Sequence, residues 1–256
     1  MLSFVEKGSG SPLVLLHAFP LSSRMWDQQI EEWSQGFRVI APDWRGFGRS
    51  PMGDKEITME QCADDLHELL SQLRLPPVAL LGLSMGGYVA FEFARKYSRH
   101  LQALILAATQ PVADSEQGRT ARFETADFVL NRGTTALADR LIPRLLGKTT
   151  LAAKPEVVQK VRALIEGNGA AGVAQACYGL AARRDSTPFL SEITVPTLLL
   201  QGAEDVIVPH SQGHLMHERV SSSQLATVDQ SGHLLNLEQP SVFSRLVLEF
   251  LHSTGS

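Results

Sequence analysis

The sequence predicts an α/β fold in which helices cover both faces of a mostly parallel sheet. Short runs of Val, Ile, Leu and Ala alternate with longer amphipathic stretches along most of the chain. Such near-continuous apolar runs are typical of strands that are buried on both faces. The 256 residues are enough for one large α/β domain or two small ones. A composition of 44% hydrophobic and 20% charged residues indicates a packed core.

The predicted strands are the short apolar runs, which follow in this order: Leu2–Glu6, Leu13–His17, Arg38–Asp43, Val78–Leu83, Leu101–Thr109, Thr197–Gly202 and Gln224–Asp229. Helices between or after these strands are predicted at Thr58–Leu73, Met85–Tyr97, His210–Arg219 and Pro240–His252. Thr58 and Gln61 have the spacing of a capping box, in which each side chain accepts from the backbone N–H of the other residue.

The alternation of strands and helices breaks between Val112 and Ser191. Consecutive helices separated by glycines are predicted there: Ser115–Arg132, Thr135–Leu146, Pro155–Gly167 and Ala170–Arg183. Helices inserted between two late strands have no sheet face left to cover, so we expect them over the strand ends. The predicted organisation is an α/β core of residues 1–111 and 192–256, with a helical cap of residues 112–191.

Charge and cysteine content limit the possible partners and compartments. The formal net charge of −4 and the pI near 6.1 give no reason to expect nucleic acid or a membrane surface as a partner. Cys62 and Cys177 lie far apart without a partner motif, which favours a reducing compartment over a disulfide framework. The N-terminus does not resemble a signal peptide, and no apolar run approaches the roughly 18–20 residues that span a bilayer. We therefore expect a soluble cytoplasmic protein, and the sequence leaves its oligomeric state open.

The strongest chemical motif is Gly82-Leu83-Ser84-Met85-Gly86, which lies between a predicted strand and a predicted helix. A sharp strand-to-helix turn of this G-x-S-x-G type exposes the serine hydroxyl at the carboxyl edge of a sheet. The following helix offers free N–H groups and a partial positive charge to a developing anion. We therefore predict that Ser84 is a nucleophile.

A serine hydroxyl needs a base to remove its proton, and the base needs a carboxylate that fixes its tautomer. His233 follows the last predicted strand, and Asp205 follows the strand before it, so both lie on the same sheet edge as Ser84. Glu204 is the adjacent competitor for the role of the acid, and Asp229 lies only four residues before His233. We predict the triad Ser84, Asp205 and His233.

Attack on a carbonyl also requires N–H donors that stabilise the oxyanion. The backbone N–H of Met85, directly after the serine, is one predicted donor. The turn His17-Ala18-Phe19-Pro20 follows an early strand, and the Phe19 N–H is the second predicted donor. For His17 itself we expect a structural role, binding nearby backbone.

The substrate pocket is predicted to lie between the cap and the serine. Apolar residues of the cap should form one wall, and Trp26 follows the oxyanion turn closely enough to contribute. The predicted pocket residues are Trp26, Phe123, Phe128, Leu141 and Tyr178. His210, His214 and His217 have a zinc-like spacing, but no matching ligand cluster accompanies them, so neither a metal nor any other cofactor is predicted.

Taken together, these motifs resemble the α/β-hydrolase fold family over nearly the whole chain. The Asp43-Trp44-Arg45-Gly46-Phe47-Gly48-Arg49-Ser50 segment resembles that family's D-x-R-G-x-G-x-S loop. Within the family, the chain is similar to small bacterial carboxylesterases and 3-oxoadipate enol-lactonases. Ala18 departs from the pattern, since glycine is common at that position of the oxyanion turn.

The predicted function is that of a serine carboxylesterase that hydrolyses short- to medium-chain esters through an acyl-enzyme, with a small-molecule ester as its partner. Three alternatives stay open on the sequence alone. A lactonase would use the same residues on a cyclic ester, and a cofactor-free perhydrolase would replace water by peroxide. A ligand receptor on the same fold would hydrolyse its ligand slowly and signal through the cap.

Overall fold

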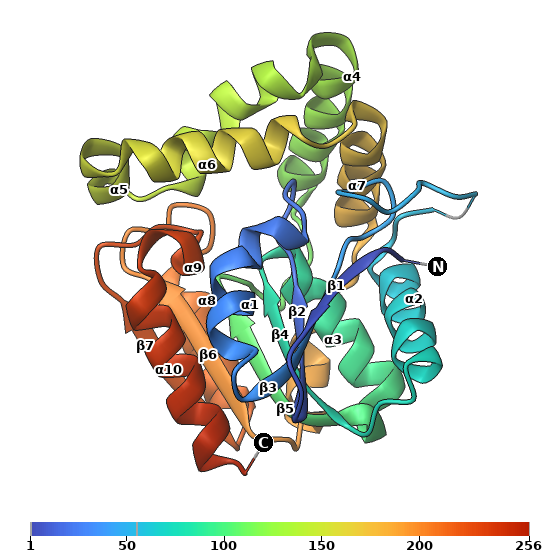
Figure 1. The fold of residues 1–256 in the computed structure, drawn as a ribbon. Coiled ribbons are helices and arrows are strands. Elements are labelled where there is room, and N and C mark those ends of the chain that lie inside the picture. The colour runs from blue at the N-terminus through green and yellow to red at the C-terminus, as the bar shows by residue number, and fades with distance from the viewer. Residues whose placement is uncertain (1, 55, 256) are drawn as a thin grey trace.

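The computed structural model describes residues 2–54 and 56–255, and this part of the chain holds one seven-stranded sheet (Figure 1). The strand order is β1-β3-β2-β4-β5-β6-β7. β1 pairs antiparallel with β3, and every other neighbouring pair is parallel. The strands are β1 Phe4–Lys7, β2 Ser11–Leu16, β3 Phe37–Pro42, β4 Val78–Leu83, β5 Leu101–Ala107, β6 Thr197–Gly202 and β7 Ser223–Val228.

The predicted strands agree with the observed ones to within about two residues at each end. β4 and β6 have the predicted bounds. β5 ends at Ala107 rather than Thr109, because Ala108 has a φ of 44° and so leaves the extended conformation. This early turn matters for the site, since the carboxyl ends of β4, β5 and β6 lie side by side in the sheet.

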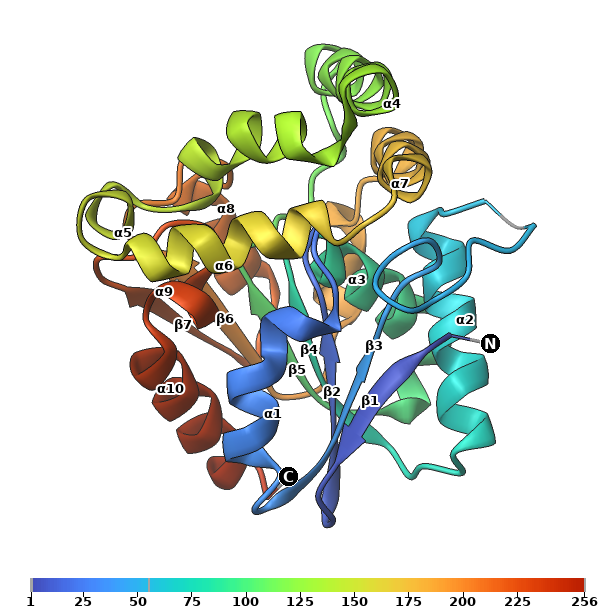
Figure 2. The same ribbon diagram turned by 45° about the horizontal axis from the view of Figure 1, so that its top comes forward.

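Helices cover both faces of the sheet. Figures 1 and 2 place α1 (Asp27–Trp33) and α10 (Pro240–Ser253) on one face, and α2 (Met59–Gln72) and α3 (Met85–Tyr97) on the other. α8 (His210–Arg219) packs against β6 and β7. Five short elements outside residues 116–182 were not predicted. They are α1, α9 (Leu235–Glu238) and the 3₁₀ helices η1 (Ser23–Trp26), η2 (Ser98–His100) and η3 (Thr187–Glu192).

The start of α2 corrects one detail of the sequence analysis. The Gln61 N–H donates to the Thr58 hydroxyl at 3.1 Å, as an N-cap should. The Gln61 side chain does not return to Thr58, because its amide Nε2 donates to Asp65 at 2.9 Å. The helix therefore has its N-cap without the reciprocal half of a capping box.

Four helices lie between β5 and β6 in the chain and stand over the carboxyl ends of the strands (Figures 1 and 2). They are α4 Glu116–Leu145, α5 Lys148–Ala153, α6 Pro155–Glu166 and α7 Ala170–Ala182. α4 contains a break at Gly133 (φ 79°, ψ 174°), where two separate helices were predicted. The division of the chain into a core and an independent cap at residues 112 and 191 stays a prediction.

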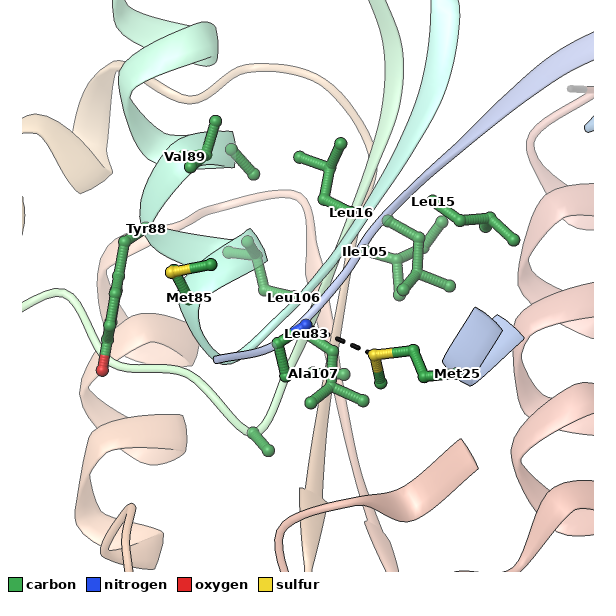
Figure 3. Packing of buried hydrophobic residues seen from close by; sticks show 14 of the residues in the cluster. Leu15, Leu16, Met25, Leu83, Met85, Tyr88, Val89, Ile105, Leu106 and Ala107 are labelled. Carbon is green, nitrogen blue, oxygen red and sulfur yellow. Dashed lines mark hydrogen bonds between the residues drawn. The ribbon is translucent and has the colours of Figure 1, made fainter. Parts of the chain in front are cut away.

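The hydrophobic core lies between the sheet and the helices, and its side chains pack against the strands that lead to the site. Figure 3 shows Leu16 and Leu106 on the side of the strands that faces α3, and Leu15 and Ile105 on the other side. All four are fully buried, and burial of such a side chain contributes about 1.5–3 kcal/mol to folding. In the same view, the sulfur of Met25 accepts a hydrogen bond of 3.3 Å from the Ala18 N–H. The oxyanion turn is thus fixed to this core at Ala18.

No helix within the described residues is long and apolar enough to cross a membrane.

Candidate active site

Ser84 lies at the turn between β4 and α3 and has strained backbone angles (φ 55°, ψ −112°). A positive φ is unusual for a residue with a Cβ, and such strain clusters at functional sites. The Ser84 N–H donates to Ala107 O at 2.9 Å, and the Thr109 hydroxyl donates to Ser84 O at 3.0 Å. A Cβ on Gly82 would come within 2.4 Å of Gly86 O, so the turn closes only with glycine there.

His233 lies between Ser84 and Asp205. Its Nε2 is 2.8 Å from the Ser84 hydroxyl oxygen, and its Nδ1 is 2.8 Å from Asp205 Oδ2. With Nδ1–H donating to the carboxylate, Nε2 is free to accept the serine proton. The structure thus brings together the three residues of the predicted triad, in hydrogen-bond geometry that suits proton transfer.

Asp205 is held as a carboxylate. Burial alone would raise its pKa, but the charge of His233 and hydrogen bonds bring the pKa below its ordinary value. These bonds come from the His233 ring and from two backbone N–H groups, Ile207 at 2.7 Å and Val208 at 3.2 Å. A carboxylate with this many donors stays ionised at neutral pH and fixes the imidazole.

The competing acids point elsewhere. Glu204 accepts hydrogen bonds from the N–H of Thr149 at 2.9 Å and from its hydroxyl at 2.6 Å. Asp229 is exposed to solvent. Of the three acids that the sequence offered near the histidine, Asp205 alone is hydrogen-bonded to it.

The junction between α4 and α5 is hydrogen-bonded to the loop that carries His233. The His233 N–H donates to Leu145 O at 3.1 Å. The buried carboxylate of Glu238 accepts from Gly147 N–H at 2.8 Å and from Leu234 N–H at 3.1 Å. Glu238 was not predicted, because its two partners include a residue 91 positions away.

A Cβ on Gly232 would lie only 2.3 Å from the Gly147 nitrogen, so these two backbones are in direct contact. Both glycines are therefore required by close approach of the α4–α5 junction to the histidine loop.

The predicted oxyanion donors share one cavity with the predicted nucleophile. Phe19, Met85, Ser84 and His233 all line a cavity of about 310 Å³. Met85 is the first residue of α3, where the backbone N–H has no partner within the helix. Among the described hydrogen bonds of turns and loops, neither the Phe19 nor the Met85 N–H has a protein acceptor. Both groups are thus available to an oxygen atom bound in the cavity.

His17 holds the oxyanion turn, as predicted. Its Nε2 accepts the Trp44 N–H at 3.1 Å, so its Nδ1 carries the hydrogen and donates to Ala18 O at 3.1 Å. Complete burial lowers the pKa of His17 to about 4, which keeps the ring neutral. A neutral imidazole bonded on both nitrogens is a structural link between the turn and the segment that begins at Trp44.

Comparison with known proteins places the chain in a family. A family model of the α/β-hydrolase fold matches residues 11–240. The chain belongs to the α/β-hydrolase family.

Several members of the family are similar to this chain over almost its whole length. An esterase from Thermogutta terrifontis, in a structure with malate bound, is 41% identical with a TM-score of 0.96, covering 100% of this chain and 94% of its own. The enol-lactonase from Burkholderia xenovorans LB400 is 25% identical with a TM-score of 0.91, covering 98% of this chain and 96% of its own. The 3-oxoadipate enol-lactonase 2 of Acinetobacter baylyi is 30% identical over 92% of this chain and 86% of its own.

Of the five residues predicted to form the substrate pocket, Leu141 lines the cavity of this α/β-hydrolase. Trp26, by contrast, is fully buried and stacks on Phe243, with ring centroids 6.1 Å apart. Trp26 does not line this cavity, because η1 turns its ring into the core.

The three aromatic residues predicted from the cap also lie outside the cavity. Phe123 and Tyr178 are exposed and face each other across α4 and α7, with centroids 6.1 Å apart. Phe128 packs on the core, with the Arg140 guanidinium 5.2 Å above its ring. The structure does not bring these three residues to the cavity beside Ser84, because apolar character alone does not show which face of each cap helix turns toward the sheet.

Polar residues that sequence reasoning missed take their place in the cavity of the α/β-hydrolase. The full lining also includes Tyr88, Gln110, Asp114, Gly118, Ala121, Arg122, Thr125, Arg144, Leu145, Leu180 and Ile207. No apolar periodicity could identify the charged members of this group. Two of them, Arg122 and Arg144, lie on opposite sides of the break in α4.

The described residues contain no group of three or more His, Cys, Asp or Glu side chains that could hold a metal ion. Two histidines of the zinc-like spacing have other partners. His210 Nε2 is 2.9 Å from Gly202 O, and His217 Nδ1 is 2.9 Å from the Ser223 hydroxyl.

Proposed function

We propose that this chain is a serine carboxylesterase that hydrolyses short- to medium-chain esters through an acyl-enzyme. The observation that carries the proposal is the position of His233, whose two ring nitrogens lie 2.8 Å from the Ser84 hydroxyl and 2.8 Å from Asp205. The strained turn at Ser84 and the unpaired N–H groups of Phe19 and Met85 in the same cavity add support.

In the proposed cycle, His233 takes the proton of Ser84 while the serine oxygen attacks the ester carbonyl. The resulting oxyanion accepts hydrogen bonds from the N–H groups of Phe19 and Met85, each worth about 3–4 kcal/mol to the transition state. His233 then gives its proton to the departing alcohol. A water molecule repeats the attack with His233 as base, and the carboxylic acid leaves. Asp205 stays ionised throughout, in accord with its lowered pKa.

The size of the cavity supports small substrates. A volume of about 310 Å³ lies at the lower end of the range for ligand pockets, which is about 300–1,000 Å³. Short to medium acyl chains are therefore the proposed range. The partner we propose is a small-molecule ester, and the two buried free thiols, Cys62 and Cys177, accord with the proposed cytoplasmic location.

Lactone hydrolysis is the second candidate, because enol-lactonases are among the similar proteins. A lactone is a cyclic ester, and the same three residues would open it through the same acyl-enzyme. The two functions differ in one respect: the alcohol of an opened lactone stays attached to the acyl group.

Initial rates on p-nitrophenyl esters of increasing chain length, measured beside a panel of lactones, test the proposal. We expect measurable turnover on the shorter esters and its loss in Ser84→Ala. Rates on lactones that exceed those on every open ester would favour the second candidate. Rates in Ser84→Ala equal to those of the wild type would refute both.

A further inference from the structure

Two arginines from opposite halves of α4 line the cavity beside Ser84. Arg122 precedes the break at Gly133 and Arg144 follows it. A straight helix would place residues so far apart at distant points, since each residue adds about 1.5 Å along the axis. The positive φ of Gly133 turns the second half of α4 back over the sheet (Figures 1 and 2), and residues of both halves line one cavity.

Asp114 is the one acidic residue among the described residues that line this cavity, and it is already paired. Arg122 Nε lies 3.0 Å from its carboxylate, and Arg183 Nη1 lies 2.8 Å from it. Burial would raise the pKa of Asp114, but these two guanidinium groups lower it. Two cations share one carboxylate, so this corner keeps a surplus of positive charge.

Arg144 has no acidic partner at all among the described residues. Some other arginines of the cap region do: Arg162 lies 2.7 Å from Asp139, and Arg184 lies 3.0 Å from Glu60. The remaining arginines of this region that have no ion pair among the described residues do not line the cavity; they are Arg119, Arg132 and Arg140. Arg144 also directly precedes Leu145, whose carbonyl accepts the His233 N–H. Arg144 is thus an exposed residue without an acidic partner among the described residues, and it lines the same cavity as Ser84 and His233.

We infer that the substrates of this cavity carry a carboxylate group, which Arg144 binds while Ser84 attacks the ester or lactone carbonyl. The inference rests on the proposed function and narrows it to anionic esters. Arg144 is a specificity-determining residue in this account, and Arg122 adds to the positive field in the same cavity.

A planar guanidinium can bind a carboxylate through two parallel hydrogen bonds. Charge-assisted hydrogen bonds of this kind correspond to about a 10- to 100-fold change in affinity. A neutral group of the same shape would lose most of that gain. The cavity should therefore discriminate between isosteric esters that differ only in this charge.

Two matched pairs of substrates measure the discrimination. Monomethyl succinate and methyl succinamate place the carboxylate or its neutral amide on the acyl side. Acetoxyacetate and acetoxyacetamide place it on the alcohol side. In each case water cleaves the acyl–oxygen bond, releasing an acid, an alcohol and one proton, which a pH-stat records. The measured quantity is the ratio of kcat/KM for the anionic ester to that for the neutral ester.

We expect this ratio to exceed about 10 in the wild type for at least one pair, and to fall toward 1 in Arg144→Ala. Arg132→Ala is the matched control, since Arg132 is an exposed residue of the same helix that does not line the cavity. A wild-type ratio near 1 for both pairs, or a ratio that Arg144→Ala leaves unchanged, would overturn the inference.

The affinities of these esters and amides for the Ser84→Ala protein, measured by calorimetry, test this inference separately from the proposed function. Monomethyl succinate or acetoxyacetate should bind that protein more tightly than its matched amide, and Arg144→Ala should remove the difference. Discrimination in binding without turnover by the wild type would retain the carboxylate site and refute the esterase. Turnover by the wild type without discrimination between ester and amide, in either kinetics or binding, would retain the esterase and refute the carboxylate site.

Discussion

The carboxylate of Glu204 accepts two hydrogen bonds from Thr149, one from the backbone N–H at 2.9 Å and one from the hydroxyl at 2.6 Å. The next residue, Asp205, accepts instead from His233. Two adjacent acids on one loop thus serve different partners, one at the α4–α5 junction and the other at the imidazole.

Substitution of each acid should separate these two roles. Asp205→Asn should lower kcat on p-nitrophenyl acetate about 10³- to 10⁴-fold, because an amide favours the wrong imidazole tautomer. Glu204→Gln should lower kcat by less than about tenfold, because Glu204 does not contact His233. Steady-state kinetics on both variants, with circular dichroism to confirm folding, measures the difference. The opposite ranking would mean that Glu204 is the catalytic acid.

Glu238→Gln should disturb the loop that carries His233. Both carboxylate oxygens of Glu238 accept a backbone N–H, from Gly147 and from Leu234, and a glutamine side chain offers only one acceptor oxygen. One buried N–H would lose its partner, at a cost of about 1–3 kcal/mol in the free energy of unfolding. We expect kcat to fall while KM changes little, because the substrate cavity itself is not altered.

The exposed Glu218 provides the control for that substitution. Glu218→Gln removes the same charge without a buried partner, so both its kinetics and its urea denaturation should match the wild type. If Glu238→Gln also kept wild-type kcat and stability, the hydrogen bonds from Gly147 and Leu234 would not position the histidine loop.

Stability should depend on pH through His17. Burial lowers the pKa of His17 from 6.5 to about 4, so between these values the unfolded chain binds a proton that the folded protein excludes. The free energy of unfolding therefore falls as the pH decreases from 6.5 to about 4, by about 3 kcal/mol from this group alone. Below about pH 4 both states bind the proton, and the contribution of His17 levels off.

Urea denaturation of the wild type and His17→Gln at several pH values between 7 and 4 checks this. The variant should show a shallower loss of stability toward low pH, even if it is less stable throughout. Parallel curves for the two proteins would show that His17 does not titrate in this way.

Much of the sheet and the triad could be predicted because both depend on local patterns. Continuous apolar runs mark strands that are buried on both faces, and the carboxyl ends of parallel strands share one edge. Ser84 directly follows β4, and Asp205 and His233 lie in the loops that follow β6 and β7. A shared edge was therefore predictable from the sequence, whereas the spatial order of the strands along it comes from the structure.

The walls of the cavity could not be predicted in the same way. The prediction of Phe123 and Tyr178 rested on hydrophobicity, yet the two rings pair with each other at the surface. The cavity instead receives Arg122 and Arg144, whose approach depends on the backbone angles of Gly133. Glu238 was also missed, since its role depends on contact between segments far apart in the chain.

The most direct test of the central claim is to trap the acyl group on the enzyme and find which residue carries it. Rapid acid quenching during turnover of p-nitrophenyl acetate, followed by peptide mass spectrometry, locates the acetyl group. The account predicts acetylation of Ser84 in the wild type and none at this position in Ser84→Ala. Acetylation that builds up on another residue at the rate of turnover, with Ser84 unmodified, would contradict it.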